Sequence, residues 1–363
     1  MFTQLLELAT APHGVDRFLE LVRPTWAADD TRARVVAATR ETPDVVTLTL
    51  RPGRGWARGR AGQHVRLGVE IDGRRHTRCF SLASSEHRTD GLVEVTVKAN
   101  PDGIVSRHLV ATAAPGLVVA LGAPEGDFTL PATRPDRLVL VSGGSGITPV
   151  MALLRTLVDE GHDRPITFLH YARTPADVIY ADELAALGRT HPQLDVHVVT
   201  TRGAGTGALT GRFCAAHLEA VVPDLGGAEA YACGPVGLVD AALAHWEQAG
   251  AIDRLHVERY SLVAAPSDGA GERASGEGST GARTHFAGSD VTVTSVGTTL
   301  LEQAEAAGLT PAFGCRVGIC RTCTRTKVSG RVRDVRSGTV SGSGEEPIQL
   351  CVSAPCHDVV VDL

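Results

Sequence analysis

Short runs in which apolar and polar residues alternate dominate the chain between residues 31 and 134. These runs are rich in β-branched residues, are separated by Gly, Pro and Asp, and read RARVVAATR, VVTLTLRP, HVRLGVEI, RCFSLAS and LVEVTVKAN. A period of two places successive side chains on opposite faces of a strand. The region is therefore predicted to form an antiparallel β-barrel or sandwich.

The pattern changes between residues 135 and 262, where apolar runs alternate with longer amphipathic segments. RLVLVSGG is followed by PVMALLRTLVDEG, PITFLHYA by DVIYADELAALGRT, and EAYACGP by VGLVDAALAHWEQAG. Apolar strands that alternate with helices of about 10–15 residues are typical of an open parallel sheet. We expect a second domain of the α/β class here.

Three further segments complete the pattern. Residues 1–30 carry leucines at roughly helical spacing and are predicted to be helical. Residues 263–283 are small and polar without periodicity, which predicts a flexible linker. Residues 284–363 begin with the alternating run VTVTSV and a helical stretch around TTLLEQAEAAG, which indicates a small α+β domain.

Net charge and hydropathy argue against several classes of protein. The 363-residue chain has a formal net charge of −6, which argues against nucleic acid or an anionic membrane as its main partner. No apolar run approaches the roughly 20 residues that a membrane-spanning helix needs. The N-terminus also lacks the basic and apolar regions of a signal peptide. We therefore expect a cytoplasmic protein whose thiols are reduced rather than paired in disulfides.

The cysteine-rich stretch FGCRVGICRTC carries the most specific chemistry. Cys315, Cys320 and Cys323 have the spacing C-x4-C-x2-C, and Cys351 follows 28 residues later. This is the plant-type spacing of ligands to a [2Fe–2S] cluster. Two alternatives are a zinc site with four cysteine ligands and a set of redox-active thiols. Zinc usually draws cysteines in closely spaced pairs, and Cys351 has no near partner at that spacing.

At this point the chain resembles a known family. GCRVGICRTC and the distal LCV are similar to the C-terminal ferredoxin module of flavin reductases that supply oxygenases with electrons. Residues 30–262 resemble the ferredoxin–NADP reductase superfamily. The resemblance implies a flavin-binding barrel (31–134), a NAD(P)H-binding α/β domain (135–262) and a β-grasp [2Fe–2S] ferredoxin domain (284–363). FAD is the expected flavin, with FMN as the alternative.

The resemblance also implies a flavin site on the barrel. In RCFSLAS the arginine would bind the flavin phosphate, the aromatic residue would stack on the ring, and the serine would lie near flavin N5. The family's tyrosine is replaced here by phenylalanine. The stretch VKANPDGIVSRHL matches the segment whose backbone N–H groups approach the pyrophosphate. The residues implied are Arg78, Cys79, Phe80, Ser81, Val97, Lys98, Gly103, Val105 and Ser106.

A glycine-rich turn between a strand and a helix, VSGGSGITP, predicts the nicotinamide dinucleotide site. Its glycines let the backbone approach a pyrophosphate at the helix N-terminus, although it lacks the GxGxxG fingerprint. The resemblance adds YACGP beside the nicotinamide, and a closing glutamate and tyrosine in HVERYSL. The residues implied are Gly143, Gly144, Gly146, Thr148, Cys233, Gly234, Pro235, Glu258 and Tyr260. Ser81, Cys233, Glu258 and Tyr260 would lie at the reacting atoms.

The ends of two predicted strands bear on the choice between NADPH and NADH. Arg173, Thr201 and Arg202 offer the cations and hydroxyls that bind a 2′-phosphate. No acidic residue, which would favour the free ribose of NADH, lies directly at either strand end. NADPH is therefore the expected electron donor, with NADH as the alternative.

Taken together, the resemblance implies that electrons pass from NADPH through FAD and the cluster to a separate terminal oxygenase. A fatty-acyl desaturase or related di-iron monooxygenase is the first choice of acceptor. A cytochrome P450, a ring-hydroxylating dioxygenase and a hybrid-cluster protein are alternatives. An iron–sulfur redox sensor or a non-catalytic zinc-bound interaction module would be a different class of protein. We expect a monomer that binds no nucleic acid and has peripheral contact with a membrane-bound acceptor.

Overall fold

The computed structural model describes residues 31–202, 209–222, 224–259, 280–313, 318, 323–335 and 339–363. The predicted N-terminal helix, most of the predicted linker, Tyr260, Cys315 and Cys320 lie outside these residues. The chain divides into two compact units, Met1–Leu262 and Val263–Leu363, and each is described by itself. None of the described helices is both long and apolar enough to cross a lipid bilayer.

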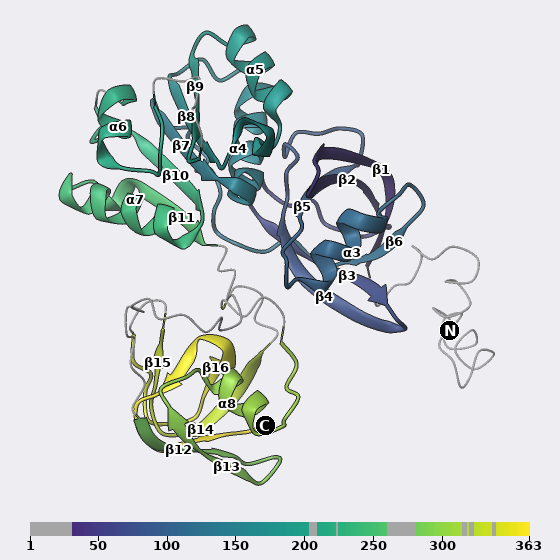
Figure 1. Ribbon diagram of the computed structural model, residues 1–363, viewed down its shortest axis with the longest axis vertical. Coiled ribbons are helices and arrows are strands. Elements are labelled where there is room, and N and C mark those ends of the chain that lie inside the picture. Colours follow the sequence, from purple (N-terminus) through teal and green to yellow (C-terminus); the bar gives the residue numbers. More distant parts are fainter. Residues whose placement is uncertain are drawn as a thin grey trace. The chain divides into compact units, whose positions relative to one another are not determined.

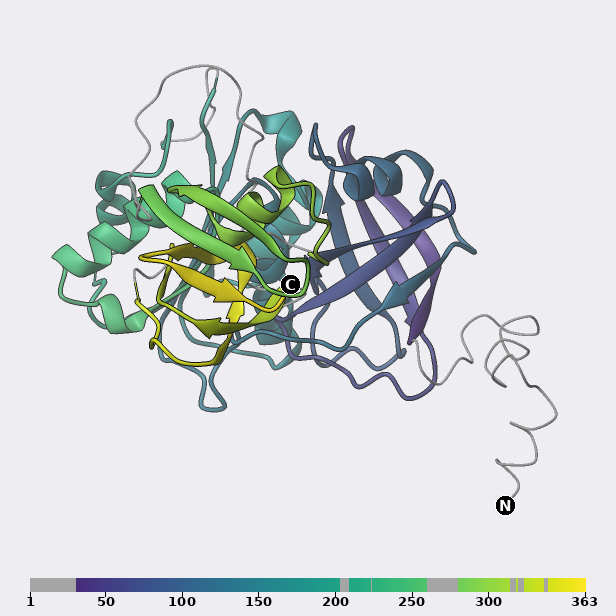
Figure 2. The ribbon, with the colours of Figure 1, turned by 90° about the horizontal axis from the view of Figure 1, so that it is seen from below.

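The first unit begins with the predicted antiparallel barrel, whose strands curve around a common core (Figures 1 and 2). Its six strands pair in the order β4-β3-β6-β1-β2-β5. An isolated bridge between Leu82 and Val95 joins the two edges of this sheet. The strands are β1 (Arg32–Thr42), β2 (Val45–Pro52), β3 (His64–Ile71), β4 (Arg74–Ser81), β5 (Val93–Lys98) and β6 (Val118–Leu121).

A helix that the alternating pattern did not predict fills the barrel. Helix α3 (Ile104–Thr112) follows β5 and buries Val105, Leu109 and Val110 in the barrel core. The sequence analysis assigned no helix here. These three apolar residues have helical spacing, and burying them inside the barrel stabilises a helix that is too short to form alone.

The predicted α/β domain follows as a five-stranded parallel sheet with the order β11-β10-β7-β8-β9. Helices α4 and α5 pack on one face of the sheet, and α6 and α7 on the other. The strands are β7 (Leu138–Gly143), β8 (Ile166–Ala172), β9 (Leu194–Thr200), β10 (Glu229–Gly234) and β11 (Leu255–Arg259). The helices are α4 (Ile147–Asp159), α5 (Ala181–Thr190), α6 (Ala215–Val221) and α7 (Val236–Gln248), and the short 3₁₀ turns are η1 (Gly144–Gly146), η2 (Pro175–Asp177) and η3 (Ile252–Arg254).

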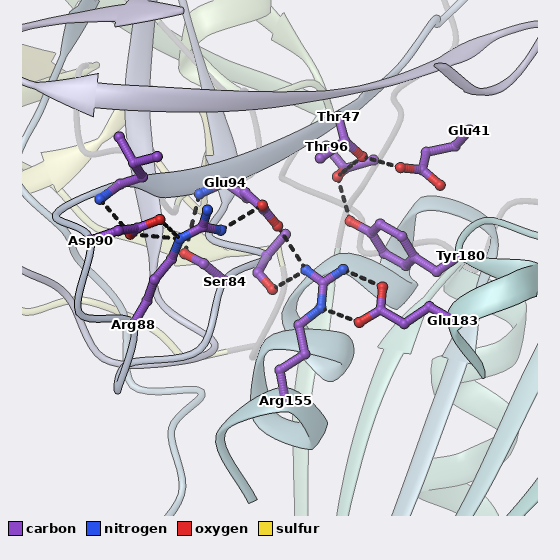
Figure 3. Close-up of polar contacts among 12 residues, drawn as sticks. Glu41, Thr47, Ser84, Arg88, Asp90, Glu94, Thr96, Arg155, Tyr180 and Glu183 are labelled. Atoms are coloured by element: carbon purple, nitrogen blue, oxygen red, sulfur yellow. Dashed lines mark hydrogen bonds and ion pairs between the residues drawn. The ribbon is translucent and has the colours of Figure 1, made fainter. Parts of the chain in front are cut away.

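Helix α4 joins the sheet to the barrel, and Arg155 is the centre of the polar part of this contact (Figure 3). Its Nε donates to Glu183 of α5 at 2.7 Å, and its Nη1 donates to Glu94 of β5 at 3.1 Å. Its guanidinium also lies 4.7 Å from the ring centroid of Tyr180, and the Tyr180 hydroxyl bonds to Thr96 of the barrel. One side chain therefore links three elements of the first unit.

Apolar packing reinforces this link. The core between α4 and the sheet is continuous with barrel residues Ala61, Ala83 and Phe128, which are all buried. Because this apolar surface and the Arg155 contacts both span the two domains, the barrel and the sheet form one folded body. Its core fixes the carboxyl edge of the sheet against the barrel.

The second unit has a five-stranded sheet with the order β13-β12-β18-β14-β16 and a separate pair, β15-β17. Helix α8 begins with a capping box formed by Thr299 and Glu302 and buries Leu300 and Leu301. Strand β12 begins at Thr280 and therefore overlaps the end of the predicted linker, residues 263–283. The elements are β12 (Thr280–Phe286), β13 (Val291–Val296), α8 (Leu300–Ala306), β14 (Thr324–Ser329), β15 (Val332–Asp334), β16 (Glu346–Gln349), η4 (Leu350–Val352), β17 (Ser353–Pro355) and β18 (Val359–Val361).

Candidate functional site

The carboxyl edge of the parallel sheet is built by two turns that pack backbone against backbone. A Cβ added at Gly146 would lie 2.3 Å from the carbonyl oxygen of Cys233, and one at Gly143 would lie 2.9 Å from Pro235. A side chain at Gly146 would overlap backbone, and one at Gly143 would force Pro235 and Leu238 to move. Gly143 and Gly146 are therefore required by the packing of η1 against the end of β10.

Gly144 differs from its two neighbours. Its φ is +54°, and a Cβ there would meet nothing within 4 Å. The backbone at this point is thus open, and helix α4 begins directly after it without a side-chain cap. Thr148 is buried, and its hydroxyl donates to the carbonyl of Ser145 at 3.0 Å, so it supports the turn from within. An uncapped helix N-terminus behind an open turn favours a bound anion.

Cys233 and Glu258 lie side by side at the same edge. They are paired in register between the parallel strands β10 and β11, so both side chains lie on the sheet face that is turned toward the barrel. Cys233 is fully buried, and burial raises the pKa of its thiol well above the usual value, with a further contribution from the charge of Glu258. A thiol in this environment stays protonated and is therefore a poor nucleophile.

The barrel contributes Ser81 and His64 to this location. The two residues are paired in register between β4 and β3, and both are 3% exposed. The Nδ1 of His64 lies 3.7 Å from a carboxylate oxygen of Glu258, which spans the junction between the barrel and the sheet. The sequence analysis identified Ser81, Cys233 and Glu258 but not His64. Only the contact between residues distant in sequence reveals it.

The phosphate-binding residues implied on the barrel surround the start of α3. Lys98 ends β5, and its Nζ lies 3.4 Å from Asp44. Gly103 is the N-cap of α3, and the Ser106 hydroxyl accepts from the N–H of Asn100 at 3.0 Å. Val97 and Val105 are buried in the barrel core, so only their backbone groups could contact a ligand.

Arg173, Thr201 and Arg202 come together at the ends of β8 and β9. The N–H of Arg202 donates to the carbonyl of Arg173 at 2.8 Å, and the Arg202 side chain is exposed. Two carboxylates, which the sequence analysis did not consider, accompany them: Arg173 lies 3.6 Å from Asp44 and 3.4 Å from Asp177. The carboxylate of Asp177 also accepts from Thr174, and this bond lowers its pKa.

In the second unit, two of the four predicted cluster ligands are described. Cys323 precedes β14 and Cys351 lies in η4, and both thiols are buried and free of disulfides. The N–H of Cys351 donates to the Sγ of Cys323 at 3.5 Å. The side chain of Gln349, at the start of η4, donates to the carbonyl of Gly318 at 2.7 Å. This bond connects η4 to the cysteine loop. Buried sulfurs that accept backbone N–H bonds fit a cluster held by thiolates.

One basic residue of the second unit is not on its surface. Lys327 belongs to a run of basic residues in the sequence that also includes Arg325, Arg331 and Arg333. Lys327 is fully buried, donates to the carbonyls of Gly342 and Gly344, and forms an ion pair with Glu346 at 3.1 Å. It therefore stabilises the fold of the second unit and contributes no surface charge.

Comparisons with known proteins identify the domains. Three family models match in order: an oxidoreductase FAD-binding domain at residues 33–130, an oxidoreductase NAD-binding domain at 140–243, and a 2Fe-2S iron-sulfur cluster binding domain at 284–356. A Mycobacterium tuberculosis protein described as an NADPH oxidoreductase is 40% identical over 98% of this chain and 90% of its own length. The chain belongs to the ferredoxin–NADP reductase superfamily, as a flavin reductase with a C-terminal [2Fe–2S] domain.

Two further similar proteins match almost the whole chain. The glycine betaine monooxygenase reductase subunit of Pseudomonas aeruginosa is 30% identical over 93% of this chain and 96% of its own length. The structure of phthalate dioxygenase reductase is similar over 92% of this chain and 97% of that chain, with a TM-score of 0.60 and 22% identity. This second likeness shows that the fold is shared. The three family models confirm the expected FAD, NAD(P)H and [2Fe–2S] cofactors, and zinc is not supported.

The residues of the reductase fit these cofactors. The Ser81 hydroxyl is buried and has no hydrogen-bond partner among the described residues, as expected where a flavin would supply one. Phe80 is half-buried against the barrel core, and Arg78 and Cys79 are partly exposed beside it. The open backbone at Gly144 and the uncapped α4 fit the pyrophosphate of NAD(P)H.

Proposed function

We propose that the reductase takes electrons from NADPH and delivers them singly to a separate terminal oxygenase. The observation that carries this proposal is the contact of His64, the strand partner of Ser81 in the barrel, with Glu258, the strand partner of Cys233 in the sheet, since the flavin and nicotinamide must meet for hydride transfer. The name of the P. aeruginosa relative, a monooxygenase reductase subunit, supports the choice of acceptor. FAD, when bound, accepts a hydride and releases its two electrons one at a time to the cluster.

The residues of the NAD(P)H domain position the donor. The backbone around Gly144 and the N-terminus of α4 bind the pyrophosphate. Cys233, Gly234 and Pro235 form the wall against which the nicotinamide packs, and the buried, protonated Cys233 adds no charge there. Glu258 orients the nicotinamide from the neighbouring strand. Tyr260 is assigned to cover the flavin, on the family resemblance alone.

The barrel residues hold the flavin. Arg78 and the backbone at Gly103 and Ser106 bind its phosphates, with Lys98 adding positive charge nearby. Phe80 and Cys79 contact the ring system, and the Ser81 hydroxyl donates toward flavin N5. The rest of the path depends on Cys315, Cys320, Cys323 and Cys351, which hold the cluster. The backbone N–H of Cys351, which donates to the Sγ of Cys323, would make reduction easier by stabilising the added charge.

NADPH is the proposed donor because Arg202 is exposed beside Thr201 and Arg173. The Arg173 charge is partly offset by Asp44 and Asp177, so Arg202 is the main candidate for the 2′-phosphate. Arg202→Ala should lower kcat/KM for NADPH by about tenfold, roughly 1.4 kcal/mol, and leave NADH almost unaffected. Arg189→Ala, on the exposed last turn of α5, is the control. Unchanged selectivity in Arg202→Ala would contradict this assignment.

The identity of the acceptor rests on the resemblance to reductases of fatty-acyl desaturases and related di-iron monooxygenases. We propose that the reductase acts as a monomer with peripheral contact to such a membrane-bound acceptor. Purified reductase should support turnover of a desaturase with NADPH and fail with ring-hydroxylating dioxygenases and cytochromes P450. If the reductase instead supported only a ring-hydroxylating dioxygenase or only a cytochrome P450, that class would be the acceptor and not the desaturase. Flavin that stays oxidised in the presence of NADPH would overturn the proposed reductase function itself.

A further inference from the structure

His64 lies at the junction of the barrel and the sheet, and neither the sequence motifs nor the proposed mechanism uses it. It opens β3, and its backbone pairs with Glu125 through two hydrogen bonds of 2.8 and 2.9 Å. Its side chain is 4% exposed. Both ring nitrogens are buried and have no hydrogen-bond partner in the described part of the chain.

Such an arrangement is costly for a side chain that only fills space. Leaving a buried polar group without a partner costs free energy that an apolar residue of the same shape avoids. Leu67 and Val69 of the same strand are buried and apolar, so the strand accepts apolar residues elsewhere. An imidazole at this position therefore points to a use for its nitrogen atoms.

The surroundings of the ring limit what that use can be. A Cβ added at Gly126 would lie 3.0 Å from the Nδ1 of His64, so the loop before the NAD(P)H domain packs directly on one side of the imidazole. Gly126 also has a φ of +113°, which other residues rarely adopt. Ser81 lies beside His64 across the β3–β4 pair. The charged group that the structure brings to the ring is Glu258.

The His64–Glu258 distance of 3.7 Å is within ion-pair range but longer than a good hydrogen bond. Contacts of catalytic groups are often long in a free enzyme and shorten when the substrate is bound. A small rotation of either side chain would bring Nδ1 into direct contact with the carboxylate. The pair also joins the barrel to β11, so it couples the flavin side of the junction to the nicotinamide side.

We propose that His64 is a positioning residue that holds the Glu258 carboxylate in the orientation needed for the nicotinamide. The inference rests on the proposed function of Glu258 and adds the residue through which the barrel controls it. His64 itself touches neither the donor nor the flavin in this account. Its effect on hydride transfer passes through Glu258.

A double-mutant cycle tests this directly, with the rate constant of flavin reduction by NADPH measured by anaerobic stopped flow. Glu258→Gln should slow hydride transfer by about 100-fold. His64→Phe, which keeps an aromatic ring but removes the nitrogens, should slow it by about tenfold through misplacement of the carboxylate. In the Glu258→Gln background, His64→Phe should have less than about a twofold further effect.

Binding and a conservative variant give independent readouts. The Kd of NADP+ measured by calorimetry should rise in His64→Phe and Glu258→Gln by similar factors, about threefold, and no further in the double variant. His64→Gln offers an amide donor to the carboxylate and should keep the rate within about threefold of the unmodified protein. His162→Phe is the matched control, because it also has an unpartnered buried nitrogen but follows the C-terminal end of α4.

The possible failures are distinguishable. If Glu258→Gln reduced flavin at the normal rate, the proposed role of Glu258 would be wrong, and this inference with it. Normal rates in His64→Phe alongside slow rates in Glu258→Gln would overturn the inference only. So would effects of the two substitutions that multiply in the double variant, since independent effects mean that His64 acts on the fold and not through Glu258.

Discussion

At the scale of single residues, Cys323 and Cys351 indicate which cysteines of the second unit are cluster ligands. A backbone N–H bond already joins their segments, so the structure brings together two cysteines that are far apart in sequence. Cys356 is nearer to Cys351 in sequence, but its N–H donates to Arg331 beside the β15–β17 pair. The spacing in the sequence and the fold therefore favour the same ligand.

We predict that Cys351→Ser abolishes the cluster and leaves the flavin intact. Three thiolates hold a [2Fe–2S] cluster poorly, so the visible and EPR signals of the cluster should be lost. Reduction of the flavin by NADPH should remain within about twofold, because the flavin site lies in the other unit. Cys356→Ser is the control and should keep the full cluster signal. A cluster that is lost from Cys356→Ser but retained by Cys351→Ser would reverse the assignment.

His170 supports the nicotinamide edge from inside the sheet and introduces a pH dependence. Its ring is fully buried and bonds to the Ser142 hydroxyl at 2.9 Å. Burial, with a smaller contribution from the charge of Lys98, lowers the pKa of His170 to about 3. The unfolded chain binds this proton near pH 6.5, so the folded state loses relative stability as the pH falls from about 6.5 toward 3.

This shift can be measured as a difference in stability. Between pH 6.5 and pH 5 the buried neutral imidazole should cost the folded state about 1.6 kcal/mol, because the unfolded imidazole goes from half to almost fully protonated and each pH unit contributes at most about 1.4 kcal/mol. His170→Gln removes the titrating group and should show a correspondingly smaller loss over the same interval. Urea unfolding followed by circular dichroism at the two pH values tests this. Equal losses in both proteins would show that His170 does not stay neutral in the fold.

At the scale of elements, the contact of α4 with α5 and β5 depends on Arg155 (Figure 3). Burial disfavours its charge, but the hydrogen bonds to Glu183 and the charges of Tyr180, Glu183 and Glu94 outweigh this and raise its pKa. The guanidinium therefore stays charged while its side chain is only 17% exposed. Removing it takes away the cation that pairs with Glu183, while Glu94 keeps its ion pair with Arg88.

Arg155→Met is predicted to destabilise the first unit by roughly 2–3 kcal/mol. This is less than the 3–5 kcal/mol of a fully buried pair, because water reaches Glu183. The control, Arg164→Met, breaks a surface pair with Asp136 and should cost no more than about 0.5 kcal/mol. Chemical unfolding with a probe in each domain also tests the coupling. If the barrel and the sheet of Arg155→Met still unfolded together, at the denaturant midpoint of the unmodified protein, a central role for Arg155 would be contradicted.

The same scale shows what sequence patterns can and cannot predict. The strands and helices of the α/β domain follow from apolar periodicity, which local residues determine. Helix α3 was missed because its stability comes from Val105 and Leu109 buried in the barrel. The burial of Lys327 does not follow from local sequence, because its partners, Gly342, Gly344 and Glu346, belong to a distant loop and strand. His64 was missed for the same reason, since Glu258 is its partner only in the fold.

At the scale of the whole molecule, three cofactor domains in one chain define a path for electrons. Motifs in the sequence identified each cofactor, because each motif supplies chemistry that few other arrangements provide. No comparable motif identifies the acceptor, since a docking surface depends on charge and shape spread over distant residues. The central claim is therefore that NADPH reduces both the flavin and the cluster within the same chain.

Anaerobic stopped-flow mixing of the purified reductase with excess NADPH tests this claim most directly. The flavin absorption should bleach first and the [2Fe–2S] absorption afterwards, with about three electrons taken up per chain, two by the flavin and one by the cluster. In Cys351→Ser the uptake should stop at about two electrons. A flavin that is reduced while the cluster absorption of the unmodified protein stays unchanged would contradict the account.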